Sequence, residues 1–209
     1  SEVIGKVWYN SGSNVWKVAV EGAGAWASGG DLNTGRATSA SAGISSSSGL
    51  DVSGTTQWPH DYLLIVEEYN GTSWTEVSDV SVGSVKCFGS GTTSSAWFAG
   101  GFTAPTVNTA RAETYNGSTW TTVASLNTAR RYGTGAGVSN TSGLTMGGEP
   151  EGGEVEQWNG TSWTETTEPN VAFAAASGGG TVTSAWVAGG GPNSRQYSHE
   201  QWNGTGWSE

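Results

Sequence analysis

Hydrophobic and polar positions along this chain alternate in short runs, and each run ends in a cluster of Gly, Asn, Ser or Thr. Alternation with a period of two is typical of half-buried β-strands, and such clusters are typical of the turns between strands. No segment shows the hydrophobic spacing of a convincing helix. The pattern therefore predicts an all-β chain of short strands joined by tight turns.

The same pattern recurs four times along the chain. Each copy has a run of small residues, a Gly-Gly pair (Ser53-Gly54 in the first copy), an acidic residue two positions before an aromatic one, and an Asn-Gly turn followed by Trp. Aligning the copies places four tryptophans in register at steps of 46, 43 and 44 residues: Trp74, Trp120, Trp163 and Trp207. A period of this size fits a four-stranded blade that must stack against its copies. We predict a β-propeller of four full repeats, at about residues 32–74, 75–120, 121–163 and 164–209.

Residues 1–31 do not contain a complete repeat. Residues 6–20 form two alternating segments around a polar turn, which is a hairpin pattern, and residues 25–30 resemble the last strand of a blade. A propeller ring must close to hide its exposed edges. We expect these N-terminal strands to close the ring, either by completing the fourth blade or by forming part of a fifth.

Glycines and aromatic residues have defined places in the repeat. The Gly-Gly pair is expected at the end of a second strand, where backbones approach closely or φ is positive. The Asn-Gly pairs predict tight hairpins in which both central residues have positive φ. The aromatic residues flanking each turn should meet across the two outer strands and pack against the next blade, at about 0.5–1.5 kcal/mol per pair beyond area burial. Two repeats share LNTxR and SGL and the other two share SAWxAGG, which hints at a duplicated pair of blades.

Charge and composition narrow the function classes. A formal net charge of −10 argues against binding to nucleic acid or to an anionic membrane surface. No apolar run is long enough for insertion across a bilayer. The single cysteine, Cys87, excludes an intrachain disulfide, and we expect it to be a small buried residue rather than a nucleophile. No motif for nucleophilic catalysis, phosphate binding or a metalloprotease is present, so we expect no enzyme activity, no cofactor and no metal.

The Gly-Gly pair followed about a dozen residues later by E-x-[YW]-N-G-x-x-W resembles the kelch repeat of galactose-oxidase-like β-propellers. The segments LNTAR and YNGTSW, with Gly- and Ser-rich inner strands, are similar to kelch-like arrays in tail-fibre and other virion surface proteins of tailed phages. This resemblance implies a non-enzymatic structural protein of the virion surface, in a tail fibre or on the capsid, for host-surface glycan recognition or subunit attachment. Its implied partners are other virion subunits, further copies of itself within the assembly, and a host glycan.

Two other function classes stay open at this point. One is a secreted, extracellular carbohydrate-binding module similar to a lectin. The other is a carbohydrate-active oxidase, which is disfavoured because no tyrosine is indicated by the sequence as a crosslinking partner for Cys87.

Irregular insertions are the candidate recognition elements, because loops vary without disturbing blade packing. Residues 55–62 and 191–199 are the equivalent insertions of the first and fourth repeats, and they contain the candidate ligand-binding residues Trp58, His60, Asp61, Tyr62, Arg195, Tyr197 and His199. Alternatively, Trp58 and Tyr62 pack over the blade or bind another virion subunit. The two histidines could also approach as a metal pair, which we disfavour because no further ligand stands at a suitable spacing.

A glutamate recurs two residues before the strand aromatic in every repeat, at Glu67, Glu113, Glu156 and Glu200. A ring of carboxylates could bind cations. We favour a structural role, in which each carboxylate accepts hydrogen bonds from neighbouring backbone or from Arg36 and Arg130 and so locks the blades together, because a binding site rarely needs the same residue in every blade.

Overall fold

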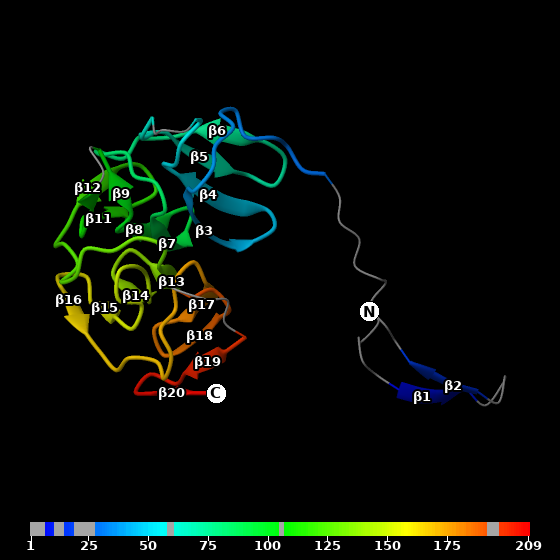
Figure 1. Ribbon diagram of the computed structural model, residues 1–209. Coiled ribbons are helices and arrows are strands. Elements are labelled where there is room, and N and C mark those ends of the chain that lie inside the picture. Colours follow the sequence, from blue (N-terminus) through cyan, green and yellow to red (C-terminus); the bar gives the residue numbers. More distant parts are fainter. Residues whose placement is uncertain (1–6, 11–14, 19–27, 58–60, 105–106, 192–196) are drawn as a thin grey trace.

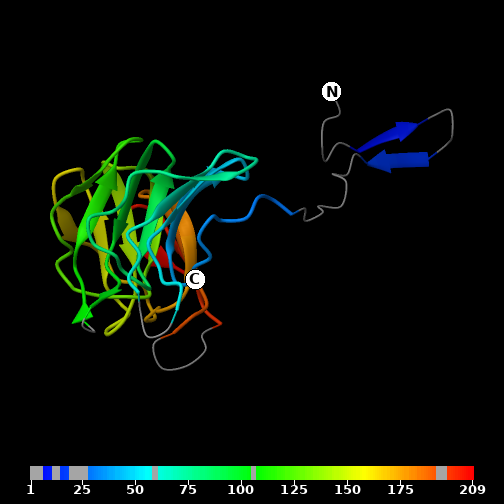
Figure 2. The same cartoon turned by 90° about the horizontal axis from the view of Figure 1, so that it is seen from above.

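The computed structural model describes all residues except 1–6, 11–14, 19–27, 58–60, 105–106 and 192–196. The described residues contain no helix and form four four-stranded antiparallel sheets, arranged as a four-bladed β-propeller (Figures 1 and 2). Within this part of the chain, no helix is long and apolar enough to cross a membrane. The predicted all-β propeller of four four-stranded repeats is confirmed.

Each blade is a meander in which consecutive strands pair, from the innermost strand to the outermost. Blade one contains β3 (Ala40–Ser45), β4 (Ser48–Val52), β5 (Val66–Tyr69) and β6 (Trp74–Glu76). Blade two contains β7 (Phe88–Thr92), β8 (Ser95–Ala99), β11 (Ala112–Tyr115) and β12 (Trp120–Thr122). Blade three contains β13 (Thr134–Ser139), β14 (Ser142–Met146), β15 (Val155–Trp158) and β16 (Trp163–Glu165). Blade four contains β17 (Ser177–Thr181), β18 (Ser184–Ala188), β19 (His199–Trp202) and β20 (Trp207–Ser208).

The inner strands lie around a common axis in the order β3, β7, β13 and β17, and neighbouring strands in this order are in contact (Figure 1). The described residues form three hydrophobic clusters, one between each pair of consecutive blades. None of these clusters joins blade four to blade one. The four blades therefore form an arc that is open on the side between β3 and β17.

Backbone hydrogen bonds also join consecutive blades where the inner strands begin. Lys86 N donates to Thr38 O, Tyr132 N donates to Lys86 O, and Ala175 N donates to Tyr132 O, at 2.7, 2.9 and 2.8 Å. All four residues occupy the same place in their blades, and all have positive φ, between 52° and 60°. These bonds join the backbones of consecutive blades, so the series helps to fix each blade against the next.

The expected closure by N-terminal strands is wrong for the strands that the structure describes. β1 (Val7–Asn10) and β2 (Val15–Val18) form the predicted hairpin, but they pair with each other and with no strand of a blade. The physical reason is that each blade already has its own fourth strand. This strand follows the Asn-Gly turn and begins at the repeated Trp, whereas the repeats predicted from the sequence end at that Trp. β20 completes blade four in this way. The segment at residues 25–30 falls partly outside the described residues.

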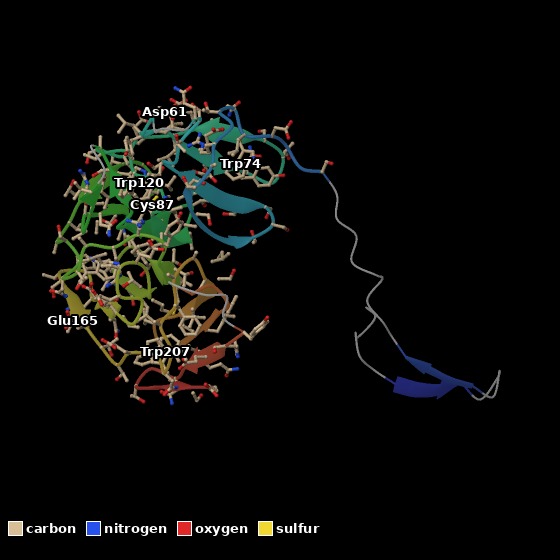
Figure 3. All side chains as sticks on the ribbon, viewed as in Figure 1. Asp61, Trp74, Cys87, Trp120, Glu165 and Trp207 are labelled. Atoms are coloured by element: carbon tan, nitrogen blue, oxygen red, sulfur yellow. The ribbon has the colours of Figure 1, made fainter. Side chains whose placement is uncertain are left out.

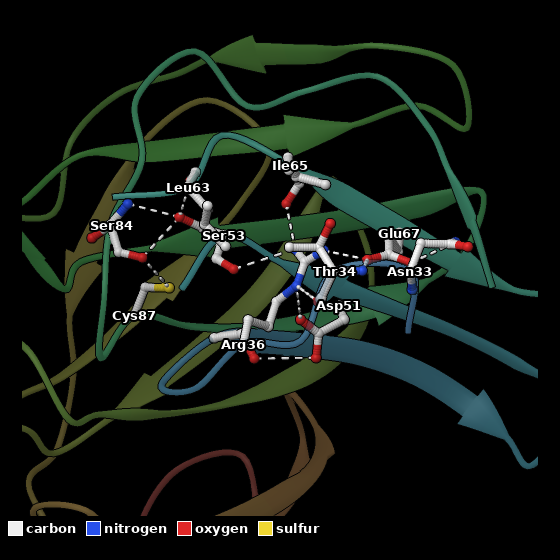
Figure 4. Close-up of polar contacts among 11 residues, drawn as sticks. Asn33, Thr34, Arg36, Asp51, Ser53, Leu63, Ile65, Glu67, Ser84 and Cys87 are labelled. Carbon is white, nitrogen blue, oxygen red and sulfur yellow. Dashed lines mark hydrogen bonds and ion pairs between the residues drawn. The ribbon is translucent and has the colours of Figure 1, made fainter. Parts of the chain in front are cut away.

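The glycine pairs have the predicted backbone conformation. Gly100, Gly147 and Gly189 have φ between 63° and 69°, and in blade one Ser53 takes their place with φ of 62°. The residue after each is a glycine that also has positive φ. A side chain in this region is strained, and Ser53 is held there by its hydroxyl. The hydroxyl proton lies between Leu63 O and Ser84 O, at 2.7 and 2.8 Å, and the hydroxyl oxygen accepts from Ser84 N at 2.7 Å (Figure 4).

The Asn-Gly turns differ from the prediction. Only the glycine of each pair has positive φ, and each loop contains four residues, as the pairing of Tyr69 with Trp74 shows. The Asn70 side chain explains the difference, because its Oδ1 accepts the backbone N–H groups of Thr72 and Ser73, at 2.9 and 3.0 Å. The same pattern recurs in the other three blades. Asparagine therefore acts through its side chain and not through a left-handed backbone.

The predicted aromatic pairs are confirmed in every blade. Their ring centroids lie 4.9–5.4 Å apart, in the pairs Tyr69–Trp74, Tyr115–Trp120, Trp158–Trp163 and Trp202–Trp207. Cys87 is buried, as expected, and lies one residue before β7 (Figure 3). Burial raises the pKa of its thiol to about 12, so the protonated form dominates at neutral pH.

Candidate functional site

The loops between the second and third strands lie at one end of the propeller, together with the segments that lead into the inner strands. This follows from the strand register, because Ala40 at the start of β3 pairs with Val52 at the end of β4. We call this end the loop face. Both insertions singled out in the sequence belong to it, since residues 53–65 join β4 to β5 and residues 189–198 join β18 to β19.

Asp61 organises the first insertion. Its carboxylate accepts hydrogen bonds from Thr55 Oγ1 at 2.6 Å, from Thr56 N at 2.9 Å and from the Thr56 hydroxyl (its position is labelled in Figure 3). These bonds lower the pKa of Asp61, with the hydroxyl of Thr55 making the largest contribution. Asp61 is thus ionised and shapes the loop, while the neighbouring Tyr62 is half-buried. Trp58 and His60 lie outside the described residues.

The second insertion ends in an exposed aromatic side chain. Tyr197 is 99% exposed, and His199, the first residue of β19, is also exposed. Arg195 lies outside the described residues. Blades one and four flank the open side of the arc, so the two insertions are not on adjacent blades. Within the described ranges, no group of three His, Cys, Asp or Glu side chains is placed to hold a metal ion.

Between these insertions, the loop face carries a cluster of cations and aromatic rings from blades two and three, which we call the Phe102 cluster. Lys86 Nζ lies 5.6 Å from the centroid of Phe102 and 4.8 Å from that of Tyr132. The Arg131 guanidinium lies 5.3 Å from the Phe102 centroid and is also paired with Glu149, at 2.6 Å. Arg131 donates a further hydrogen bond to Asn108 Oδ1, at 2.7 Å.

Sequence reasoning missed the Phe102 cluster. Phe102 and Asn108 lie on β9 (Phe102–Thr103) and β10 (Val107–Asn108), a short hairpin that the repeat did not reveal. An alignment of the four repeats with one another does contain a signal for this cluster. Lys86 and Tyr132 occupy the same position before the inner strand, where blades one and four have the small residues Thr38 and Ala175. Large side chains at that position of adjacent blades point to a shared surface feature.

The recurring glutamates lie below the loop face and are buried. Glu67 accepts hydrogen bonds from Asn33 N and Nδ2 at 2.7 and 2.8 Å, and it forms an ion pair with the buried Arg36 (Figure 4). Glu156 does the same with Asn127 and with Arg130, whose Nη1 lies 3.0 Å away. Glu113 accepts from Ser81 N and pairs with Arg111, and Glu200 accepts from Asn170 and Val171. Each carboxylate therefore holds the segment that leads into the inner strand of its own blade. The structural role is as expected, but these bonds lie within single blades and do not lock one blade to the next.

A cavity of about 810 Å³ lies along the axis, lined mainly by Ser and Gly residues of β3, β7, β13 and β17. Small inner-strand side chains leave this space open, as expected for strands that converge on an axis. Polar and apolar atoms contribute about equally to its wall, and Cys87, whose side chain is buried, contributes to the lining.

No protein-family model matches this chain, and no curated protein matches it at a significant level.

Proposed function

We propose that this chain is a non-enzymatic recognition module whose loop face binds a glycan, and that it belongs to the surface of a tailed-phage virion as a kelch-type propeller. The observation that carries the recognition role is the combination, on one face, of a loop shaped by Asp61, the exposed ring of Tyr197 and the Phe102 cluster. Sugars are bound by aromatic surfaces together with fixed polar groups, and this face supplies both. The virion setting is supported by the resemblance of the repeat to phage kelch-like arrays.

The fold supports this role because the blades are rigid and the loops project from them. The glutamate anchors and the aromatic pairs hold the strands of each sheet at fixed positions, and the loop face is built on the ends of these strands. Cys87 is buried with a raised thiol pKa, and the recurring glutamates are buried and accept hydrogen bonds from the protein, so we assign neither a nucleophilic role. Binding without turnover is the activity that this arrangement favours.

Glycan-array screening of the 209-residue chain tests the recognition role. We expect a restricted set of bound glycans and at least a tenfold loss of affinity in Tyr197→Ala and in Lys86→Ala. Val138→Ser is the matched control, because Val138 is 51% exposed at the opposite end of the propeller and its replacement should leave the profile unchanged. An array without bound glycan, or equal losses in all three variants, would contradict the proposal.

Quantitative mass spectrometry of purified particles tests the virion setting separately. The chain should be present at a fixed ratio to the major structural subunits of the virus that encodes it. Its absence from particles, combined with glycan binding by the isolated chain, would favour the secreted lectin-like alternative.

A further inference from the structure

The two sides of a blade are chemically different, and the difference alternates around the arc. We call the side that contacts the following blade the forward side and the side that contacts the preceding blade the rear side. On the second strand of each blade, one position faces forward, occupied by Leu50, Trp97, Leu144 and Trp186, and the position before it faces the rear, occupied by Gly49, Ala96, Gly143 and Ala185. Blades one and three therefore combine forward Leu with rear Gly, and blades two and four combine forward Trp with rear Ala.

The contact between blades two and three shows why Trp is followed by Gly. Trp97 is 1% exposed and lies directly on Gly143, where an added Cβ would stand only 2.3 Å from its Nε1 atom. Its ring meets Trp163 edge to face, with centroids 5.3 Å apart. A forward Trp thus requires a following blade whose rear position has no side chain.

Blade four also has a Trp at its forward position, Trp186, but no described blade follows to cover it. Trp186 is 42% exposed, although it occupies the position of Trp97. A Cβ at Gly147 would clash with Phe173 O of the following blade, whereas a Cβ at the equivalent Gly189 would meet nothing within 4 Å. Gly54, Gly101 and Gly148 each donate a backbone hydrogen bond to a carbonyl of the next blade, but the equivalent Gly190 has no such next carbonyl in the described chain.

Blade one presents the matching rear side. Gly49 occupies the position of Gly143, and an added Cβ there would approach only atoms of its own blade, Ala42 O at 3.7 Å and Trp74 Cη2 at 4.0 Å. Tyr69 is half-buried, whereas its equivalents Tyr115, Trp158 and Trp202 are buried against a preceding blade. Gly29 and Gly30 lie at the outer edge of this side, near the Tyr69 hydroxyl and Thr72, away from Gly49.

We propose that the forward side of blade four binds the rear side of blade one of a second copy of this chain. In this contact Trp186 lies on Gly49 of the second copy and meets its Trp74, as Trp97 lies on Gly143 and meets Trp163. Across this contact, as between blades two and three, a blade with a forward Trp is followed by a blade with a rear Gly. Ser41 stands where blade three has Gly135, so the Trp186 ring shifts slightly from the position of Trp97.

Two backbone hydrogen bonds extend across the same contact. By equivalence with the bonds between blades two and three, Gly190 N donates to Arg36 O of the second copy, and Thr38 N of the second copy donates to Ala175 O. The contact is of the head-to-tail kind, which joins unlike surfaces and gives a closed ring or an open series of copies according to the angle between them.

Light scattering coupled to size-exclusion chromatography tests the proposal on the 209-residue chain. We expect a mass of at least twice the 21.4 kDa of one chain at micromolar concentration. Trp186→Glu and Gly49→Gln should each give a single-chain mass, because each removes one of the two surfaces. Both changes leave the isolated blade room to fold, since Trp186 is partly exposed and Gly49 has open space, and far-ultraviolet circular dichroism checks this. Val107→Ser, which alters a 56% exposed valine away from both sides, should keep the wild-type mass.

Mixing the two variants distinguishes a head-to-tail contact from any other. Trp186→Glu keeps an intact blade one and Gly49→Gln keeps an intact blade four, so an equimolar mixture should form a complex of two chains and stop there. A single-chain mass for the wild-type protein at every concentration would overturn the proposal, and so would an assembly that both variants leave unchanged.

Discussion

At the scale of single residues, the buried glutamates show how one chemical problem is solved four times. Each blade must bring a polar segment close to its inner strand, and the N–H groups of that segment need acceptors where water is excluded. A carboxylate at the same position of the third strand supplies them, with Asn33, Asn127 and Asn170 as donors in three blades. Arginine adds a buried positive charge in blades one and three only.

This difference between blades predicts unequal effects of one substitution. Glu156→Gln should lower the free energy of unfolding by about 3–5 kcal/mol, because it leaves buried Arg130 without its charged partner. Glu200→Gln should cost about 1–2 kcal/mol, since Glu200 accepts hydrogen bonds from Asn170 and Val171 and forms no ion pair among the described residues. Urea unfolding followed by tryptophan fluorescence measures both. Equal losses would contradict the assigned role of Arg130.

Glu67 gives a pH dependence with a defined sign. Burial raises the pKa of its carboxyl, but hydrogen bonds from Asn33 and Thr34 and the charge of Arg36 outweigh burial and lower the pKa below its usual value of 4.5. A carboxyl with a lowered pKa in the folded state stabilises the fold above that usual value and loses this contribution as the pH falls through the lowered one. Wild-type protein should therefore lose stability below pH 4.5, relative to Glu67→Gln.

The comparison with the variant is needed because Asp51 acts in the opposite direction. Burial raises the pKa of Asp51, so its contribution improves as the pH falls over the same range. Urea midpoints at pH 6 and pH 3.5 for both proteins measure the Glu67 contribution as a difference. A difference that does not change with pH would contradict it.

At the scale of elements, the second strand of each blade is followed by a left-handed residue, and in blades one to three the next blade covers that residue. This arrangement explains why the position is glycine in three blades and why Ser53 needs two hydrogen bonds to occupy it. The covering differs among blades, because Gly147 lies against Phe173 and Gly189 lies against nothing in the described chain.

Alanine at these two glycines should therefore have different effects. Gly189→Ala should cost about 1–2 kcal/mol, which is the price of a left-handed conformation with a side chain. Gly147→Ala should cost at least about 2 kcal/mol more, because its Cβ would stand 2.2 Å from Phe173 O and the backbone must move. Thermal unfolding at submicromolar concentration, followed by tryptophan fluorescence, ranks the two variants as single chains. A larger loss for Gly189→Ala would contradict the assignment of the open side.

Much of each element could be predicted from the sequence, and the failures have physical causes. The four strands, the glycine pairs and the aromatic pairs follow from alternation and from the constant step between tryptophans. The Asn-Gly turns were mistaken for two-residue hairpins because the letters are the same for both, and only the Asn70 side-chain bonds decide between them. The Phe102 cluster was missed because its members come from separate loops, which no repeat aligns.

At the scale of the whole molecule, stability depends on three hydrophobic contacts between blades. A single sheet cannot bury either of its faces, so each blade depends on its neighbour, as in other repeat architectures. The middle contact contains three of the four buried tryptophans of the described residues, Trp97, Trp158 and Trp163. A single substitution in this middle contact should therefore affect the unfolding of the whole chain.

Trp97→Ala should lower the free energy of unfolding by about 3–5 kcal/mol and should reduce the cooperativity of the transition, because blades one and two then separate from blades three and four. Trp186→Ala, at the equivalent but exposed position, should cost less than about 1 kcal/mol in dilute solution. Urea unfolding at submicromolar concentration compares them. A cooperative transition for Trp97→Ala would contradict the division into halves.

The rear glycine at position 143 sets a counting rule for descendants of this chain. The indole of one sheet packs only against a neighbouring sheet that has glycine at the position of Gly143. A sheet with leucine in place of the indole is followed by a sheet with alanine at that position. Deleting or duplicating a single sheet would break this pairing. An indole would then clash with alanine, or a leucine would face glycine and leave a cavity. Genes of this type should therefore gain and lose sheets two at a time.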